Sequence, residues 1–179
     1  MRKIILNLAM SLDGYISDED GGFEWIVGEN DNSKDTKEQF DFDFNKFLDD
    51  CDTIVMGRKS YEDIPKETFE EFQNKKIYVA TNKNLEVNED NVEIINGDIV
   101  EKILQLKEIE GKNIWIFGGA ILADAFIKAD IIDEYIVGII PCILGKGRKL
   151  FLENNPTINL HLKNYSFSDG IAIMTYSKR

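Results

Sequence analysis

Residues 113–128 read NIWIFGGAILADAFIK, and this stretch decides the fold that the sequence predicts. Residues 113–117 form an apolar run of strand length, Gly118 and Gly119 mark a turn, and residues 120–128 continue as a mostly apolar helix. A helix that is apolar on most sides must be covered, and a strand that is apolar throughout is buried on both faces. The stretch therefore predicts one unit of an α/β protein, in which helices pack on a mostly parallel sheet.

The alternation of strand and helix continues on both sides of this unit. Apolar runs predict further strands over 3–10, 53–56, 76–81, 92–95 and 135–140. Helical spacing and caps predict helices over 35–50, 58–64 and 98–109, and a hairpin is expected over 158–167 and 171–177. We therefore expect one domain over residues 1–179, with a central mixed, mostly parallel sheet, flanking helices and a C-terminal antiparallel hairpin.

The three helices have different sequence signals. The first carries apolar side chains at helical spacing, namely Phe40, Phe44, Phe47 and Leu48. The second is expected to stop at Pro65. In the third, Asp98 is the predicted cap, and the inner stripe is expected to contain Ile99, Ile103, Leu104 and Leu106.

Composition and charge exclude several classes of protein. The chain has 179 residues and 43% hydrophobic residues, which suffices for one core. Its net charge of -12 would repel a nucleic-acid backbone, so a general nucleic-acid binder is excluded. No apolar stretch reaches the roughly 20 residues that a membrane-spanning helix needs. Cys51 and Cys142 are too few for a disulfide framework, so we expect a reduced, cytoplasmic chain.

A single histidine narrows the chemistry further. His161 alternates with apolar neighbours in a predicted strand and is expected on the polar face. With no second histidine and no paired cysteines, the sequence argues against a Ser-His-Asp triad and against zinc sites of the HExxH or Cys/His type. No metal site is predicted.

Small and cationic residues follow several strand ends, where ligands gather in open α/β sheets. Gly57 lets a ligand approach the backbone, and Arg58 beside Ser60 suits a phosphate; alternatively, Gly57 serves only the turn and Arg58 is solvated. Gly118 and Gly119 allow main chain to meet a pyrophosphate at a helix start, or form only a tight turn. At a neighbouring strand end, Thr81, Asn82 and Lys83 suit a phosphate on a ribose. The GxGxxG fingerprint of ordinary dinucleotide-binding folds is absent.

Three segments together resemble a known group of enzymes. They are AMSLDGYI at 9–16, MGRKSYE at 56–62 and IWIFGGAILADAFIKADIIDEYIVGIIPCILGKGRKLF at 114–151. The ordered set is similar to the dihydrofolate-reductase-like superfamily, and more narrowly to the C-terminal reductase domain of the riboflavin-biosynthesis deaminase-reductase and its single-domain relatives. The resemblance implies an NADPH-dependent reductase, often a homodimer, that transfers hydride to a small heterocyclic or sugar-derived substrate such as 5-amino-6-(5-phosphoribosylamino)uracil.

The resemblance also implies roles for particular residues. Those expected to bind NADPH are Gly57, Arg58 and Ser60 for the adenosine-side phosphates, Thr81, Asn82 and Lys83 for the 2'-phosphate, and Gly118, Gly119, Ala120 and Ile121 for the pyrophosphate. Asp13 is expected at the substrate side, where it would hold a hydroxyl or donate a proton if burial raises its pKa; alternatively, Asp13-Gly14 is only a turn. Trp25 would cover the nicotinamide or substrate, or else plug the core, and Lys146 and Arg148 would meet a substrate phosphate.

The sequence also departs from the family pattern. The segment FDFDFNKFLDDCDTIVMGRKSYEDIP at 40–65 lacks the His-and-Arg-containing helix and the GxxTVxxDxP pattern of riboflavin-pathway reductases, which leaves the pyrimidine ribotide substrate in doubt. Asp41 and Asp43 lie where folate reductases carry a helix carboxylate, although phenylalanines bracket them. A dihydrofolate or pterin reductase is therefore one alternative, and a non-catalytic NADP-binding module is another.

Overall fold

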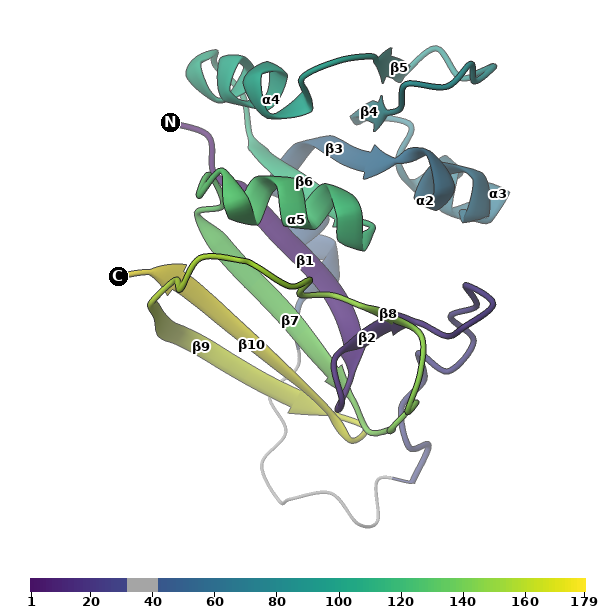
Figure 1. Ribbon diagram of the computed structural model, residues 1–179, viewed down its shortest axis with the longest axis vertical. Coiled ribbons are helices and arrows are strands. Elements are labelled where there is room, and N and C mark those ends of the chain that lie inside the picture. Colours follow the sequence, from purple (N-terminus) through teal and green to yellow (C-terminus); the bar gives the residue numbers. More distant parts are fainter. Residues whose placement is uncertain (32–41) are drawn as a thin grey trace.

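The computed structural model describes residues 1–31 and 42–179, and its centre is one twisted eight-stranded sheet (Figure 1). The strand order is β5-β4-β3-β6-β1-β7-β10-β9. The strands are β1 (Ile4–Ser11), β3 (Cys51–Gly57), β4 (Lys76–Ala80), β5 (Val92–Ile95), β6 (Asn113–Gly118), β7 (Glu134–Ile140), β9 (Leu160–Ser168) and β10 (Ile171–Lys178). Neighbouring strands from β5 to β7 are parallel, and β10 runs antiparallel to both β7 and β9. The predicted fold class is confirmed.

Helices cover both faces of the sheet. They are α1 (Phe44–Asp49), α2 (Arg58–Asp63), α3 (Lys66–Glu71), α4 (Ile99–Glu108) and α5 (Ala120–Lys128). Ile103 of α4 and Phe126 of α5 pack with Ile116 on one face. Phe47 of α1 packs with Trp115 on the other. Ile116 and Trp115 are consecutive, so the two-residue period of a strand alone assigns them to opposite faces.

A small second sheet was not predicted. It pairs β2 (Tyr15–Ser17) with β8 (Arg148–Lys149) in antiparallel fashion, and Ser17 lies opposite Arg148. Strands of two or three residues carry too little hydrophobic alternation to be recognised in a sequence. The pairing brings together two segments that are more than a hundred residues apart in the chain.

Several predicted elements are confirmed at their ends. β5 and α5 have the predicted bounds, and the side chain of Asp98 caps α4 by accepting a hydrogen bond of 3.1 Å from the amide of Glu101. The hairpin of β9 and β10 is present, and His161 is exposed as expected. These elements have strong local signals, namely a side-chain cap, a turn sequence and an uninterrupted apolar run.

Of the helix predicted over 35–50, the described residues show a helix over Phe44–Asp49. α1 begins at Phe44, because the carboxylate of Asp43 accepts a hydrogen bond of 2.8 Å from the amide of Lys46 and so caps the helix. Phe42 therefore precedes the helix. The predicted positions of Phe40 and Asp41 lie outside the described residues.

One prediction in the helices is confirmed and one was wrong. α2 ends at Asp63, directly before the Ile64–Pro65 pair as predicted, and Pro65 then occupies the cap position of α3, where the missing N–H of proline costs no hydrogen bond. Leu104 is 41% exposed, whereas Ile103 is fully buried, so the inner stripe of α4 is narrower than expected. In the part of the chain that the structure describes, no helix is long and apolar enough to cross a membrane.

Two ionic clusters tie the chain ends to the sheet. Arg2 is 6% exposed, and its guanidinium donates to the side chains of Asp52 and Thr53 and to the carbonyl of Lys112. Glu134 accepts hydrogen bonds from Lys3 beside β1 and from Lys163 of β9. Burial of Glu134 raises its pKa, but the bonds from Lys163 and Lys3 outweigh this effect and hold the pKa below its usual value.

Candidate active site

A cavity of 1180 Å³ opens at the carboxyl ends of β3, β4 and β6 and extends over the face of the sheet that α1 covers. Pockets for single small ligands usually measure about 300 to 1000 Å³. This cavity therefore has room for two ligands side by side. Its lining residues fall into two groups of different chemistry, which we call the cationic end and the aromatic end.

Glycines bring bare main chain to the cavity between β3 and β6. A β-carbon at Gly57 would lie 3.9 Å from the amide nitrogen of Gly119, so these two strand ends are in backbone contact. Gly118 has a φ of +127°, a conformation that side chains rarely allow, and the peptide bond between Gly118 and Gly119 is cis. The predicted approach of main chain to a ligand at these glycines is therefore sterically open.

The first turn of α5 adds hydrogen-bond donors to this area. Gly119 is the N-cap and supplies no side-chain cap, and Ala120, Ile121 and Leu122 all line the cavity. The first amides of a helix have no partner within it, and the helix dipole makes them attractive to an anion. Ile121 is 82% exposed, an unusual position for an isoleucine. The arrangement suits a pyrophosphate at the glycine turn.

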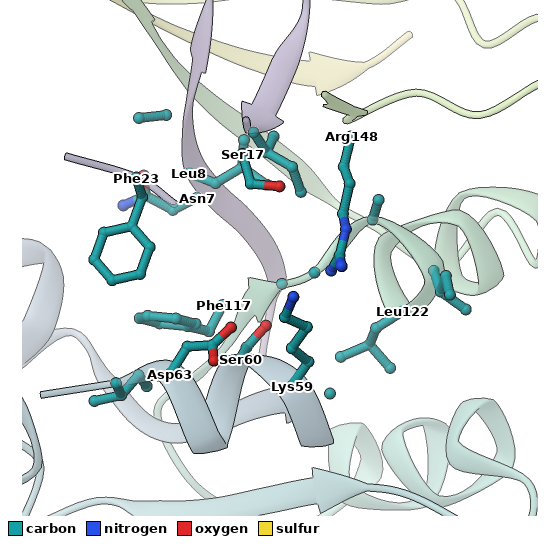
Figure 2. Close-up of a pocket in the computed structure, with 18 of the residues that line it drawn as sticks. Asn7, Leu8, Ser17, Phe23, Lys59, Ser60, Asp63, Phe117, Leu122 and Arg148 are labelled. Atoms are coloured by element: carbon teal, nitrogen blue, oxygen red, sulfur yellow. The ribbon is translucent and has the colours of Figure 1, made fainter. Parts of the chain in front are cut away.

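Two cations define the cationic end together with Ser17. A β-carbon at Gly21 would lie 2.6 Å from Nζ of Lys59 and 4.0 Å from a guanidinium nitrogen of Arg148, so the two charged heads are neighbours. Figure 2 shows Lys59 rising from α2 and Arg148 descending from β8 toward the same space. Neither has an acidic partner among the described residues. Two adjacent unpaired cations provide the charge that an anion needs.

The hydroxyl of Ser17 supports the same conclusion. Ser17 is only 9% exposed and lines the cavity, and its Oγ has no hydrogen-bond partner within the described part of the chain. Figure 2 shows this oxygen on the side of the cavity that Arg148 occupies. A buried hydroxyl without a partner costs free energy, and a bound phosphate oxygen would remove that cost.

The other predicted cofactor residues lie in different environments. Thr81 and Asn82 line the cavity, and Asn82 also accepts a bond of 3.3 Å from the amide of Gly97. Arg58 lines it as well, but its guanidinium is 2.6 Å from the carboxylate of Glu62 on the same helix. Lys83 is exposed and does not line the cavity. Their roles toward the adenosine phosphates stay predictions.

The aromatic end lies over the centre of the sheet. It is lined by Phe23, Ile26, Phe42, Phe44, Ile64, Pro65, Trp115, Phe117, Ile171 and Ile173. The rings of Trp115 and Phe44 are nearly perpendicular, with centroids 5.9 Å apart, and the centroid of Phe117 lies 5.1 Å from that of Trp115. Such a wall excludes water and offers flat surfaces for stacking.

Two polar side chains stand out beside these rings. Asn7 lies in the middle of β1. Its side-chain amide nitrogen forms no hydrogen bond with the described residues, whereas its backbone carbonyl accepts a hydrogen bond of 2.9 Å from the indole N–H of Trp115. Asp63 at the end of α2 is the one acidic side chain among the described lining residues. Figure 2 places it next to Phe117 and Ser60, between the two ends of the cavity.

Asp13 does not line the cavity. Its carboxylate accepts bonds of 2.7 Å from the hydroxyl of Ser11, 3.1 Å from the amide of Leu144 and 2.7 Å from the amide of Gly145. The bond from Ser11, aided by the two amides, lowers the pKa of Asp13 below its usual value. The condition set for a proton donor, a pKa raised by burial, is therefore not met, and these contacts fix the loop that leads to β8.

The two remaining predicted substrate residues are also outside the lining. Trp25 donates a bond of 3.3 Å to the carbonyl of Gly22, while its neighbours Phe23 and Ile26 reach the cavity. Lys146 is exposed and paired with Glu19. Neither side chain lines the cavity, so contact of either with a substrate stays a prediction.

Comparison with known proteins places the chain in a family. The sequence model of the RibD C-terminal domain matches residues 2–171. Two proteins of Bacillus subtilis strain 168, described as uncharacterized, are similar over most of their length: YyaP is 34% identical over 188 residues, covering 98% of this chain and 94% of YyaP, and YwjB is 37% identical over 166 residues, covering 90% of each. The chain belongs to the RibD C-terminal domain family.

Solved structures agree with this assignment. A putative riboflavin biosynthesis protein from Shewanella sp. PV-4 is 27% identical with a TM-score of 0.77, covering 100% of this chain and 99% of that chain. A deaminase and 5-amino-6-(5-phosphoribosylamino)uracil reductase from Thermotoga maritima is 21% identical with a TM-score of 0.71, and the match covers 99% of this chain and 57% of that chain. At that identity the second likeness shows the fold alone. The RibD C-terminal domain family is associated with reductases of riboflavin biosynthesis, so the chain is a reductase-type protein.

Sequence reasoning missed three side chains of this cavity, Lys59, Asn7 and Asp63. It expected Arg148 at a substrate phosphate; Arg148 does line the cavity, but its proximity to Lys59 and Ser17 depends on the pairing of β2 with β8. Asn7 is a polar residue within an otherwise apolar strand. This pattern could have indicated a binding site, because a buried polar side chain needs a hydrogen-bond partner. Asp63 is adjacent to the quoted MGRKSYE segment and carries no local signal of its own.

Proposed function

We propose that this protein is an NADPH-dependent reductase that transfers hydride to a small heterocyclic substrate bound in the same cavity. The observation that carries the proposal is the continuity of the cavity, whose cationic end suits phosphates and whose aromatic end suits a ring. Hydride transfer needs two flat groups held face to face in a dry site. Membership of a reductase family supports the same reaction class.

The residues present fit the cofactor. The glycine pair and the first turn of α5 would hold the pyrophosphate, and Lys59, Arg148 and Ser17 would neutralise and bond it. Thr81 and Asn82, with Lys83 next to them in the chain, would receive the 2'-phosphate. NADPH over NADH is expected because only NADPH carries the phosphate that these residues would bind. When bound, NADPH supplies the hydride.

The chain itself would orient the substrate and handle the proton. The rings around Trp115 and Phe44 exclude water from the reacting atoms. Reduction of a C=N or C=O bond takes up one proton beside the hydride, and Asp63 is the lining carboxylate placed to pass that proton from solvent. Alignment and exclusion of water would supply most of the rate, as in other cofactor enzymes.

Two measurements test the proposal. NADPH is titrated while the fluorescence of Trp115, which lines the cavity, is followed, and NADPH absorbance is then followed with a panel of pyrimidines and pterins. Binding with consumption by one compound supports the reductase. Binding without consumption by any compound would favour the non-catalytic NADP-binding module, and no binding at micromolar NADPH would remove both. The homodimer and the cytoplasmic location stay predictions.

A further inference from the structure

We infer that the aromatic end takes an uncharged, planar heterocycle that carries no phosphate. The inference rests on the proposed function, because it assigns the cationic end to the cofactor. It excludes phosphorylated substrates, such as the phosphoribosyl compound named for the Thermotoga maritima structure.

The shape of the aromatic end suits a flat ring. Its floor is formed where β1, β7 and β10 lie side by side, with Ala9 opposite Gly138 and Gly138 opposite Ile173. A β-carbon at Gly138 would lie 3.7 Å from Cγ1 of Ile173 and 3.9 Å from Cα of Ala9. Small residues at these two positions leave a shallow slot in the sheet, and Trp115 and Phe44 stand beside it.

The charges of the lining argue against a second phosphate group. Within the described residues the lining holds three cations, Arg58, Lys59 and Arg148, and all belong to segments that also line the cationic end. A dinucleotide with three phosphates would occupy them. The remaining charged side chain is Asp63, a carboxylate between the two ends, which would repel a phosphorylated sugar.

The polar groups that remain suit the edge of a heterocycle. The side-chain amide of Asn7 is without a partner in the described part of the chain and offers a donor to a ring carbonyl or ring nitrogen. The carboxylate of Asp63 accepts from a ring N–H or amino group. A site with one donor and one acceptor between apolar walls recognises a small ring through hydrogen bonds to the polar atoms on the edge of that ring.

A matched pair of compounds tests the inference. The protein is first saturated with NADP⁺, with binding verified by fluorescence, so that the cationic end is filled and no turnover occurs. It is then titrated by calorimetry with 5-amino-6-(5-phosphoribosylamino)uracil, with the same compound after removal of its 5-phosphate, and with pterin. The unphosphorylated compound is expected to bind about tenfold or more tightly than its phosphorylated partner, because Asp63 repels the phosphate.

Two variants separate charge from shape. Asp63→Asn is expected to strengthen binding of the phosphorylated compound and to reduce the preference severalfold. Gly138→Ala is expected to weaken binding of the unphosphorylated compound and of pterin severalfold, because the added methyl enters the slot. The NADP⁺ affinity should stay nearly unchanged, because the methyl makes only ordinary van der Waals contacts with the chain. Leu104→Ala, at an exposed position on α4 outside the cavity, is the control and should change neither.

The outcomes are distinct. Equal or tighter binding of the phosphorylated compound to the NADP⁺-loaded protein overturns the inference and leaves the proposed reductase standing. Failure of that loaded protein to bind either compound or pterin also overturns it, because the aromatic end would then not take a ring. Failure of NADP⁺ and NADPH themselves to bind overturns the proposed function instead.

Discussion

Substitution of Arg148 by methionine should weaken NADPH binding without destabilising the protein. Methionine keeps an unbranched, flexible stem similar to that of arginine and removes the guanidinium with its charge. In the free protein the guanidinium lies next to the ammonium of Lys59, and neither is neutralised by an acid among the described residues. Loss of one of two adjacent like charges costs the free protein nothing and slightly relieves repulsion, so its free energy of unfolding should stay within about 0.5 kcal/mol of the wild type.

The size of the affinity loss follows from the exposure of the site. A hydrogen bond to a charged group contributes about 1.5 to 3 kcal/mol, and the lower part of this range applies because Arg148 is exposed and screened by solvent. We therefore expect a loss of about 1 to 2 kcal/mol, which is roughly 5-fold to 30-fold in Kd. The difference should shrink as salt is raised, because the Debye length falls from about 10 Å at 0.1 M to about 3 Å at 1 M.

The assay is a fluorescence titration with NADPH at two salt concentrations, combined with urea unfolding of the free protein. Lys146→Met is the matched control, because Lys146 lies on the same loop but is paired with Glu19 and does not line the cavity. It should leave the Kd unchanged. A Kd for Arg148→Met within twofold of the wild type, or a variant that is clearly less stable, would refute the assignment of Arg148 to a phosphate.

Four further outcomes follow from the same contacts. Trp115→Phe should abolish the fluorescence change on NADPH binding, whereas Trp25→Phe should keep it, because only Trp115 lines the cavity. Asp13→Asn should weaken NADPH binding through the loop that leads to β8 and leave the pH profile of kcat unchanged; a shifted profile would restore a role in proton transfer. Arg2→Met should lower the free energy of unfolding in urea by about 2 to 4 kcal/mol, because it leaves a carboxylate partner without its cation; a loss under 1 kcal/mol contradicts this. The lowered pKa of Glu134 stabilises the fold above the ordinary glutamate pKa of about 4.3, and this contribution is lost as the pH falls through the folded pKa, so Glu134→Gln should flatten the acid limb of a stability curve measured from pH 7 to 3.

The parts of the site that the sequence predicted are those carried by main chain. Gly57, Gly118 and Gly119 each follow an apolar run, and parallel strands end at the same edge of a sheet, so their convergence could be expected from the sequence alone. Thr81 and Asn82 follow by the same rule. The rule gives the place of a residue and says nothing of where a long side chain points. Arg58 lies at the expected strand end, but its guanidinium forms an ion pair with Glu62.

The aromatic end could not be read in this way, because its walls come from separate parts of the chain. Phe23 lies in a loop, Phe44 begins α1, and Trp115 and Ile173 belong to strands that do not touch each other. Each reads in the sequence as an ordinary core residue. They line a cavity because small residues beneath them, such as Gly138, leave space that a larger side chain would fill.

By itself, the sequence determined the α/β architecture, the order of most strands and helices, and the glycine turns at the sheet edge. These depend on hydrophobic period, caps and backbone freedom, which are properties of a few consecutive residues. Only the tertiary structure decided that Lys59 and Arg148 approach each other near Ser17, that Asp13 holds a loop, and that Gly138 lies in the lining of the same cavity. Contacts of that kind join residues far apart in the chain, and the charge, burial and space at each are set only when distant strands pair.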